Sequence, residues 1–461
     1  MHGGLTPSWR ARAAWIAALM ALLAGRGDAV LAAGGRYAAS GHGSATTGVN
    51  RLPTLYSRGE CGHCHGNRAS AGSPPVEFPY VLFAQEEDVC WACHDGSVSL
   101  AADARVAFSS TPANTATDYY KHPVSSLFSG VTPSAHRNGE SLASAFSGGS
   151  RHAECTDCHD PHSAANTGVA GTSVHTPGGS NGNRLSGALL GPTGLRVTSW
   201  QGAGQPLSAA AYSFGALTST SANYEWQLCL KCHSTFAALP VYSAVGSGNF
   251  LANKLTSLTT GQVQEYQDLG QACNPNNLSF HPVAAPGRNT AIAAASFVAP
   301  WSATSTLYCS DCHGPAVGAA GALGPHGSAN MHILKKPCYL QENTHYLDPT
   351  SGRSIGVGPD DLCCQCHRWE TYVRGSDPST NTGFRNGSDN FHSMHASQVR
   401  SVTCYVCHDT HGTNKEHLIN FNRAVVTGSL SSQAAYTHTA TGGSCNLTCH
   451  GEGHDPYSYS H

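Results

Sequence analysis

The chain has 461 residues, of which 11% are charged and 8% aromatic, and it contains 51 glycines and 24 prolines. This loop-forming composition offers little apolar material for a large core, so it argues against two or three ordinary globular domains. The formal net charge is −3 and there is no basic run, which argues against nucleic-acid binding.

Residues 1–33 have the pattern of a secretory signal peptide. Arg10 and Arg12 precede an apolar stretch from Ala13 to Ala24, and Val30-Leu31-Ala32 supplies the residues for cleavage, which is expected after Ala32 or Ala33. The stretch is too short to span a membrane comfortably, and no later segment approaches the required length. We therefore expect an exported chain, periplasmic or at the outer cell surface, with no membrane span after the leader is removed.

Eight short motifs of two cysteines followed by histidine punctuate the rest of the chain, and we number them 1 to 8. Seven have the spacing Cys-x-x-Cys-His, and the eighth has one extra residue between its cysteines. They are Cys61–Cys64–His65, Cys90–Cys93–His94, Cys155–Cys158–His159, Cys229–Cys232–His233, Cys309–Cys312–His313, Cys363–Cys366–His367, Cys404–Cys407–His408 and Cys445–Cys449–His450.

This motif is the signature of c-type haem attachment, in which both cysteines bind the porphyrin and the histidine binds the iron. A single copy would compete with a redox Cys-x-x-Cys pair or half of a zinc site. Repetition, with histidine always directly after the second cysteine, favours eight haem c groups.

Three cysteines, Cys273, Cys338 and Cys364, remain outside the motifs. A disulfide between Cys338 and Cys364 would brace the chain ahead of motif 6 and leave one thiol over. In motif 6 regular spacing selects Cys363 for attachment, although Cys364 is the adjacent alternative.

The second axial ligand of each iron is expected to be histidine. The mature chain has only Met331 and Met394 as methionine alternatives, whereas the whole chain has 27 histidines. Sequence context, often an adjacent proline or glycine, selects eight candidates: His42, His122, His162, His281, His326, His395, His411 and His454. His392 is the rival of His395. The remaining histidines that follow the leader are expected to be bystanders: His63, His136, His152, His175, His332, His345, His417, His438 and His461.

Two candidates lie very close to a motif histidine. His162 follows His159 by three residues, so their Cα atoms are at most about 10 Å apart. So short a loop cannot pass around a porphyrin to the opposite face of the same iron. His162 is therefore predicted to serve a different haem, and so is His411 next to His408.

The order of motifs and candidate ligands recurs along the chain. Motifs 2 and 3, 4 and 5, and 6 and 7 each enclose a candidate histidine, with motifs 1 and 8 at the ends. This predicts a mostly irregular fold with short α-helices and few short strands, wrapped around a quasi-linear haem array. The expected divisions are 34–85 with haem 1, 86–228 with haems 2–3, 229–350 with haems 4–5, and 351–461 with haems 6–8. Acidic residues predict helix starts at Glu86 and near Tyr224.

The repeated motifs, the His-Pro-Val segments at His122 and His281, and Cys-His-Asp-Pro-His at 158–162 resemble extracellular multihaem c-type cytochromes of metal-reducing bacteria. The resemblance covers most of the mature chain but consists of short motifs. It implies bis-histidine haems and respiratory electron export to redox proteins or extracellular acceptors. Some members of that group assemble into filaments.

Electron transfer without bond-making chemistry is the leading interpretation, so no catalytic residue is assigned. The alternative is a multihaem oxidoreductase with one open iron that reduces nitrite, hydroxylamine or a sulfur oxyanion. Such enzymes often mark the open iron with lysine in place of the motif histidine, and all eight motifs here carry histidine.

Overall fold

The computed structural model describes most of the chain between residues 37 and 460, in many separate segments. These are 37–51, 56–65, 86–97, 103–108, 120–122, 124, 153–165, 183–218, 223–234, 268–316, 323–339, 345–375, 382–398, 402–422, 425–427, 436–449 and 451–460. The expected leader lies outside the described residues.

The described α-helices are one or two turns long. They are α2 (Gly62–His65), α3 (Glu86–Trp91), α4 (Arg105–Phe108), α7 (Cys155–Cys158), α8 (Glu225–Leu230), α9 (Leu269–Ala272), α10 (Cys309–Cys312), α11 (Phe391–Ser393) and α12 (Cys404–Cys407). Six of them contain motif cysteines, and α3 and α8 lie where acidic residues predict helix starts. So short a helix is marginal alone, because nucleation is unfavourable, and depends on its surroundings.

Shorter helical turns lie between these helices. The 3₁₀ turns are η2 (Gly187–Leu189), η3 (Ala209–Ala211), η6 (Ala294–Ser296), η7 (Met331–Ile333), η8 (Leu362–Gln365) and η12 (Glu416–Leu418). Two π-helical turns, η9 (Glu370–Arg374) and η11 (Met394–Gln398), lie near motifs 6 and 7.

Most strands form two-stranded antiparallel ribbons. The pairs are β1 (Tyr120–Lys121) with β5 (Gly327–Ser328), β2 (Thr193–Val197) with β3 (Tyr212–Ala216), β4 (Ser279–Phe280) with β10 (Gly412–Thr413), β6 (Tyr346–Leu347) with β7 (Ser354–Ile355), and β8 (Arg385–Asn386) with β9 (Asp389–Asn390). Two of these ribbons, β1–β5 and β4–β10, join segments far apart in sequence.

A larger antiparallel sheet lies at the C-terminal end. Its central strand β13 (Gly442–Cys449) pairs with β11 (Val426–Thr427), β12 (Tyr436–Thr439) and β14 (Glu452–Ser460). A register shift interrupts the β13–β14 pairing between Cys445 and Leu447.

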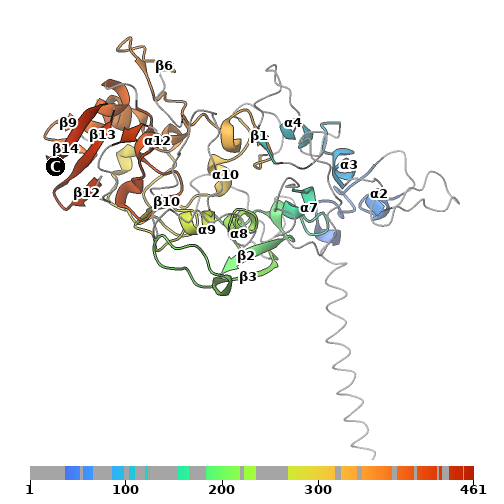
Figure 1. The fold of residues 1–461 in the computed structure, drawn as a ribbon. Helices are drawn as coiled ribbons and strands as arrows, with labels where there is room; N and C mark the ends of the chain where they lie inside the picture. Colours follow the sequence, from blue (N-terminus) through green and yellow to red (C-terminus); the bar gives the residue numbers. More distant parts are fainter. Residues whose placement is uncertain are drawn as a thin grey trace, which may run out of the picture.

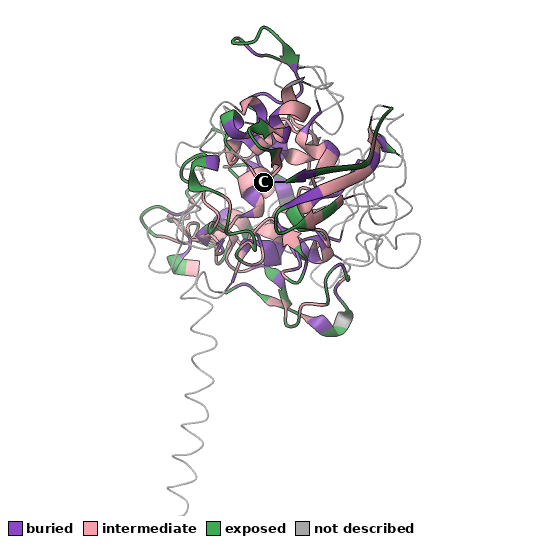
Figure 2. Cartoon of the chain, turned by 90° about the vertical axis from the view of Figure 1, so that its left-hand side faces the viewer, coloured by how far each residue is buried: buried purple, intermediate pink, exposed green. Residues whose placement is uncertain are grey.

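Among the described residues, apolar side chains gather in several separate clusters rather than one core. One contains Leu195, Leu207, Trp226 and Leu230, and another, beneath the C-terminal sheet, contains Val406. Buried residues are correspondingly spread through the molecule (Figure 2). Each cluster lies beside at least one motif, so the apolar material is divided among the motifs.

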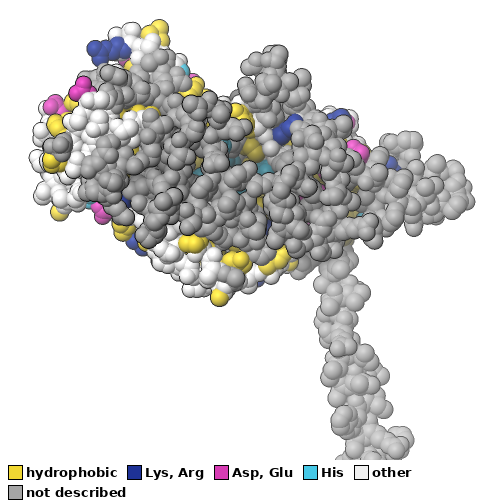
Figure 3. Space-filling model, in the orientation of Figure 1, with side chains coloured by type: hydrophobic (Ala, Val, Ile, Leu, Met, Phe, Trp, Pro, Cys, Tyr) yellow, Lys and Arg dark blue, Asp and Glu magenta, His cyan; other side chains and the backbone are white. Residues whose placement is uncertain are grey.

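The described elements follow one another along the long axis in nearly their sequence order (Figure 1). Helices α2 and α3 lie at one end, α8 and α10 near the middle, and β12 to β14 at the other end. On the face in Figure 3, described charged side chains are scattered rather than gathered in a patch. Within the described part of the chain, no helix has the length and hydropathy needed to cross a membrane.

Candidate haem-binding sites

The seven regular motifs share one backbone geometry. In each, the main-chain N–H of the histidine donates to the carbonyl of the first cysteine, at 2.8–3.0 Å. This helical turn brings the two cysteines onto one face, because residues three apart in a helix have Cβ atoms about 5–6 Å apart. After motifs 3, 5 and 7 the histidine itself is extended, with ψ of 130°, 125° and 143°, so the chain leaves the helix there.

Each of these seven motif histidines faces a second histidine. Two imidazoles bound about 2 Å from one metal ion, on opposite sides, have ring centres about 6 Å apart. The observed separations are His65–His162 5.9 Å, His94–His42 6.0 Å, His159–His326 6.0 Å, His233–His122 6.2 Å, His313–His411 6.2 Å, His367–His281 6.4 Å and His408–His392 6.1 Å. The residues present at motifs 1 to 7 therefore fit a bis-histidine iron.

Hydrogen bonds fix the tautomer of many of these imidazoles. The Nδ1 atoms of His159, His313 and His408 donate to the main-chain carbonyls of Ala188, His332 and His417, at 2.8–2.9 Å. A carbonyl can only accept, so Nδ1 carries the proton and Nε2 keeps its lone pair. Metal-binding histidines are commonly oriented in this way.

Burial also keeps several facing histidines neutral. Burial, reinforced by neighbouring imidazoles, lowers the pKa of His233 and His392 to about 3. Burial likewise lowers the pKa of His367 and His411 to about 4. The neutral imidazole is the form that binds a metal ion.

Six of the histidines that face a motif histidine are joined two by two through a hydrogen-bonding pattern that we call a clasp. In each clasp, Nδ1 of the first histidine donates to the carbonyl of the residue directly before the second. The clasps are His42 to Pro161 before His162 (3.2 Å), His122 to Pro325 before His326 (2.6 Å) and His281 to Thr410 before His411 (2.7 Å). Ribbon β1–β5 joins the two segments of the second clasp, and ribbon β4–β10 those of the third.

The two histidines of a clasp face histidines of different motifs. In the first clasp, His162 lies opposite His65 of motif 1, and His42 lies opposite His94 of motif 2. His159, three residues before His162, lies opposite His326 instead. The clasps therefore group the motifs as 1–2, 3–4 and 5–6. The order of motifs along the chain predicts the groups 2–3, 4–5 and 6–7 instead. The two groupings differ because motif order carries no information on which distant segments pair as strands.

The C-terminal region supplies two facing histidines from one helical segment. His392 on α11 lies opposite His408, and His395 on η11 lies opposite His454 on β14 at 6.3 Å. From the sequence, His392 is only the rival of His395 as a candidate ligand. The two are three residues apart in a helical segment, and this spacing could have indicated that both face inward.

Motif 8 differs from the other seven. Cys445 and Cys449 both lie on β13, where four extended residues would separate their Cα atoms by about 13 Å, less any shortening at the register shift. That is too wide for two thioethers on one porphyrin, so β13 as it stands does not fit attachment through both cysteines. His450 lies outside the described residues.

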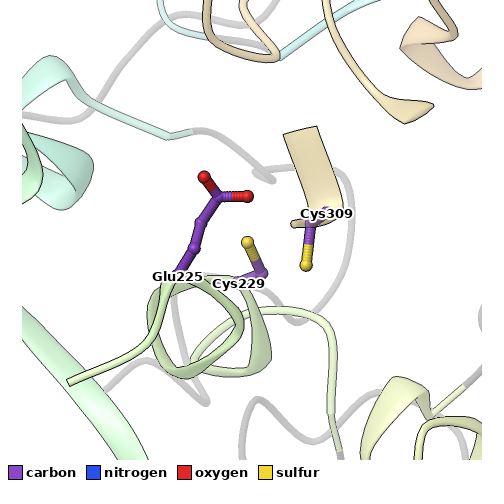
Figure 4. A group of neighbouring side chains, drawn as sticks. All are labelled: Glu225, Cys229 and Cys309. Atoms are coloured by element: carbon purple, nitrogen blue, oxygen red, sulfur yellow. The ribbon is translucent and has the colours of Figure 1, made fainter. Parts of the chain in front are cut away.

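A buried carboxylate joins motifs 4 and 5. Glu225, at the start of α8, accepts hydrogen bonds from the main-chain N–H and the hydroxyl of Ser310 on α10, both at 2.8 Å. Possible ligand atoms of Glu225, Cys229 and Cys309 lie within 4.8 Å of one another. Figure 4 shows the two thiols side by side, with Glu225 projecting from the same helix as Cys229. The first cysteines of motifs 4 and 5, which belong to successive clasped units, thus meet at this contact.

None of the three cysteines outside the motifs forms a disulfide in the structure. Cys364 is buried with Ile355, Val357 and Trp369, whereas the thiol of Cys338 lies against Cys363. The suggested disulfide between Cys338 and Cys364 is therefore not formed, because Cys364 points into the apolar cluster. Cys273 is buried beside Trp226.

The described bystander histidines have other partners. His63 contacts the main chain of Arg51 and Ser57, and His345 lies 2.9 Å from a carboxylate oxygen of Asp361. His332 and His417 present their carbonyls to motif histidines. His136, His152, His175 and His461 lie outside the described residues.

No protein-family model matches this chain, and no curated protein or solved structure proved similar to it.

Proposed function

We propose that the chain is a multihaem c-type cytochrome that carries electrons through eight covalently attached haems. The observation that supports this most strongly is the set of seven imidazole pairs with ring centres 5.9–6.4 Å apart. One member of every pair directly follows a Cys-x-x-Cys turn. An iron held by two imidazoles can change oxidation state without an open position, which is the chemistry of an electron carrier.

The proposed attachment residues are the sixteen motif cysteines, and the proposed axial ligands begin with the eight motif histidines. Facing ligands at motifs 1 to 7 are His162, His42, His326, His122, His411, His281 and His392, in motif order. At motif 8, His395 is one proposed ligand, and the other is either His454 or the motif histidine His450. The eighth haem requires β13 to bend so that both cysteines reach one porphyrin.

An enzyme with an open iron has less support, because every regular motif histidine faces another imidazole. An exported carrier would exchange electrons with other redox proteins or with extracellular acceptors, and self-assembly into filaments is compatible with that role. The resemblance and the expected leader are the grounds for this setting.

Mass spectrometry of the purified mature protein tests the cofactor count, and electron paramagnetic resonance tests the ligands. We expect eight haems, all low-spin, and no turnover of nitrite or hydroxylamine. Six or fewer haems, or a stoichiometric high-spin iron with matching turnover, would refute the proposal.

A further inference from the structure

Glu416, His417 and His438 form a cluster at the edge of the C-terminal sheet, outside the proposed haem sites. Glu416 and His417 lie on η12, and His438 lies on β12. One possible ligand atom from each residue lies within 4.8 Å of the other two. The Nδ1 of His438 lies 2.6 Å from a carboxylate oxygen of Glu416, and the rings of His417 and His438 are 4.6 Å apart.

We propose that this cluster binds a divalent transition-metal ion of the zinc class. Two imidazoles and one carboxylate are a donor set that suits Zn²⁺, Ni²⁺ or Co²⁺ better than Ca²⁺ or Mg²⁺, which prefer oxygen alone. Donors about 2 Å from a tetrahedral ion lie about 3–4 Å apart, so small side-chain rotations close the site. The ion replaces the proton that His438 donates to Glu416, as metal binding commonly does.

The site is open to solvent. Side-chain exposure is 50% for Glu416 and 29% for His438, and His417 is also exposed. An ion can therefore enter without unfolding the sheet, and its remaining coordination positions are available to water. Among the described residues the other such group, Glu225 with Cys229 and Cys309, belongs to the haem-attachment contact.

A matched turn elsewhere in the chain shows that the local fold does not require this donor set. His332 after motif 5 and His417 after motif 7 both have left-handed backbones, with φ of 63° and 58°. Both accept a hydrogen bond at their carbonyl from the motif histidine, at 2.8 Å. The residue before His332 is Met331, whereas the residue before His417 is Glu416. The carboxylate is thus a feature of the second turn alone.

The site is adjacent to motif 7, because the carbonyl of His417 accepts the hydrogen bond from Nδ1 of His408. A bound divalent cation adds positive charge close to the proposed haem ligand, which disfavours the ferric state. Zinc binding is therefore expected to raise the reduction potential of one haem. This second effect, unlike binding itself, rests on the proposed function.

The test is calorimetric titration of the chelator-treated, haem-loaded full chain with Zn²⁺. We expect the wild type to bind one more equivalent of Zn²⁺ than His438→Ala or His417→Ala. In Glu416→Gln the amide oxygen still accepts from His438 but carries no charge, so we expect zinc affinity to fall by more than about tenfold. His345→Ala, which removes another carboxylate-paired histidine, is the matched control and should keep the equivalent.

Equal zinc stoichiometry and affinity in the wild type and His438→Ala would overturn the proposed site. His438 and Glu416 would then form an ordinary ion pair. A rise in one haem potential with Zn²⁺ that persists in His438→Ala would overturn the link to motif 7. Haem content, measured by absorbance on the same samples, shows whether each variant is folded. Six or fewer haems would refute the proposed function without changing the zinc stoichiometry, so the two failures are distinguishable.

Discussion

Motifs 1 to 6 and the C-terminal region reach the same separation of facing imidazoles by different routes. In the first region, each clasp draws its two histidines from distant segments, as when His122 donates to Pro325 across 203 positions. In the second region, His392 and His395 lie three residues apart on one helical segment and face His408 and His454. A common spacing reached through unrelated contacts indicates that the spacing, and not any one fold element, is what the structure maintains.

The largest effect is expected from removing the attachment residues of the two regions. Cys445→Ala with Cys449→Ala should lower the haem count from eight to seven and leave the other haems intact, because no clasp includes β13. The matched pair Cys155→Ala with Cys158→Ala should lower the yield of folded protein as well, because the histidine of motif 3 faces His326, which belongs to the clasp that joins motifs 3 and 4. Mass spectrometry and expression yield distinguish the two. A haem count that is the same in the wild type and in the first variant would show that motif 8 binds none.

Removing a clasp histidine tests the exchange of ligands between neighbouring motifs. His162→Ala should leave one iron five-coordinate and high-spin at motif 1, because His162 faces His65 at 5.9 Å. The iron at motif 3, next to His162 in sequence, should stay low-spin because His159 faces His326. Electron paramagnetic resonance counts the high-spin iron. A second variant, which combines His162→Ala with the loss of Cys61 and Cys64, lacks the haem of motif 1 and so shows whether that haem holds the high-spin iron. A high-spin signal that survives in the second variant would contradict the clasp.

The ligands of motif 8 are tested by a set of single variants. The ring pair of His395 and His454, 6.3 Å apart, leads us to expect a high-spin iron from His395→Ala and also from His454→Ala. His450→Ala is the contrasting variant. If His450→Ala produces the high-spin iron while His454→Ala does not, the motif histidine His450 binds the iron. In that case β13 rearranges enough for His450 to take the position of His454.

The smallest effect is expected at the contact between motifs 4 and 5. Glu225→Ala leaves the buried N–H and hydroxyl of Ser310 without this acceptor, which should destabilise the contact by about 1–3 kcal/mol. Glu225→Gln keeps one acceptor oxygen and should be destabilised less. Amide hydrogen exchange of α8 and α10 measures both variants. Unchanged protection in Glu225→Ala would show that the attachment residues alone hold the two units together.

Much of the proposed site was accessible from sequence because haem attachment is a local property. Two cysteines and a histidine within five residues identify a site without knowledge of the rest of the fold. The three-residue spacing of His159 and His162 is an equally local feature, and it limits how far apart the two Cα atoms can lie. Sequence context favours His395 over His392, because it does not show that two histidines on one helical segment face different partners.

The sequence by itself determined the eight motifs that are the proposed attachment sites, the supply of histidines and the absence of material for one large core. Only the tertiary structure decided which histidine faces which motif, since that depends on strand pairing such as β1 with β5 and β4 with β10. Strands of two residues carry almost no sequence signal of their own. Their register comes from the packing of distant segments, so the facing pairs, and the cluster at Glu416, became visible only in three dimensions.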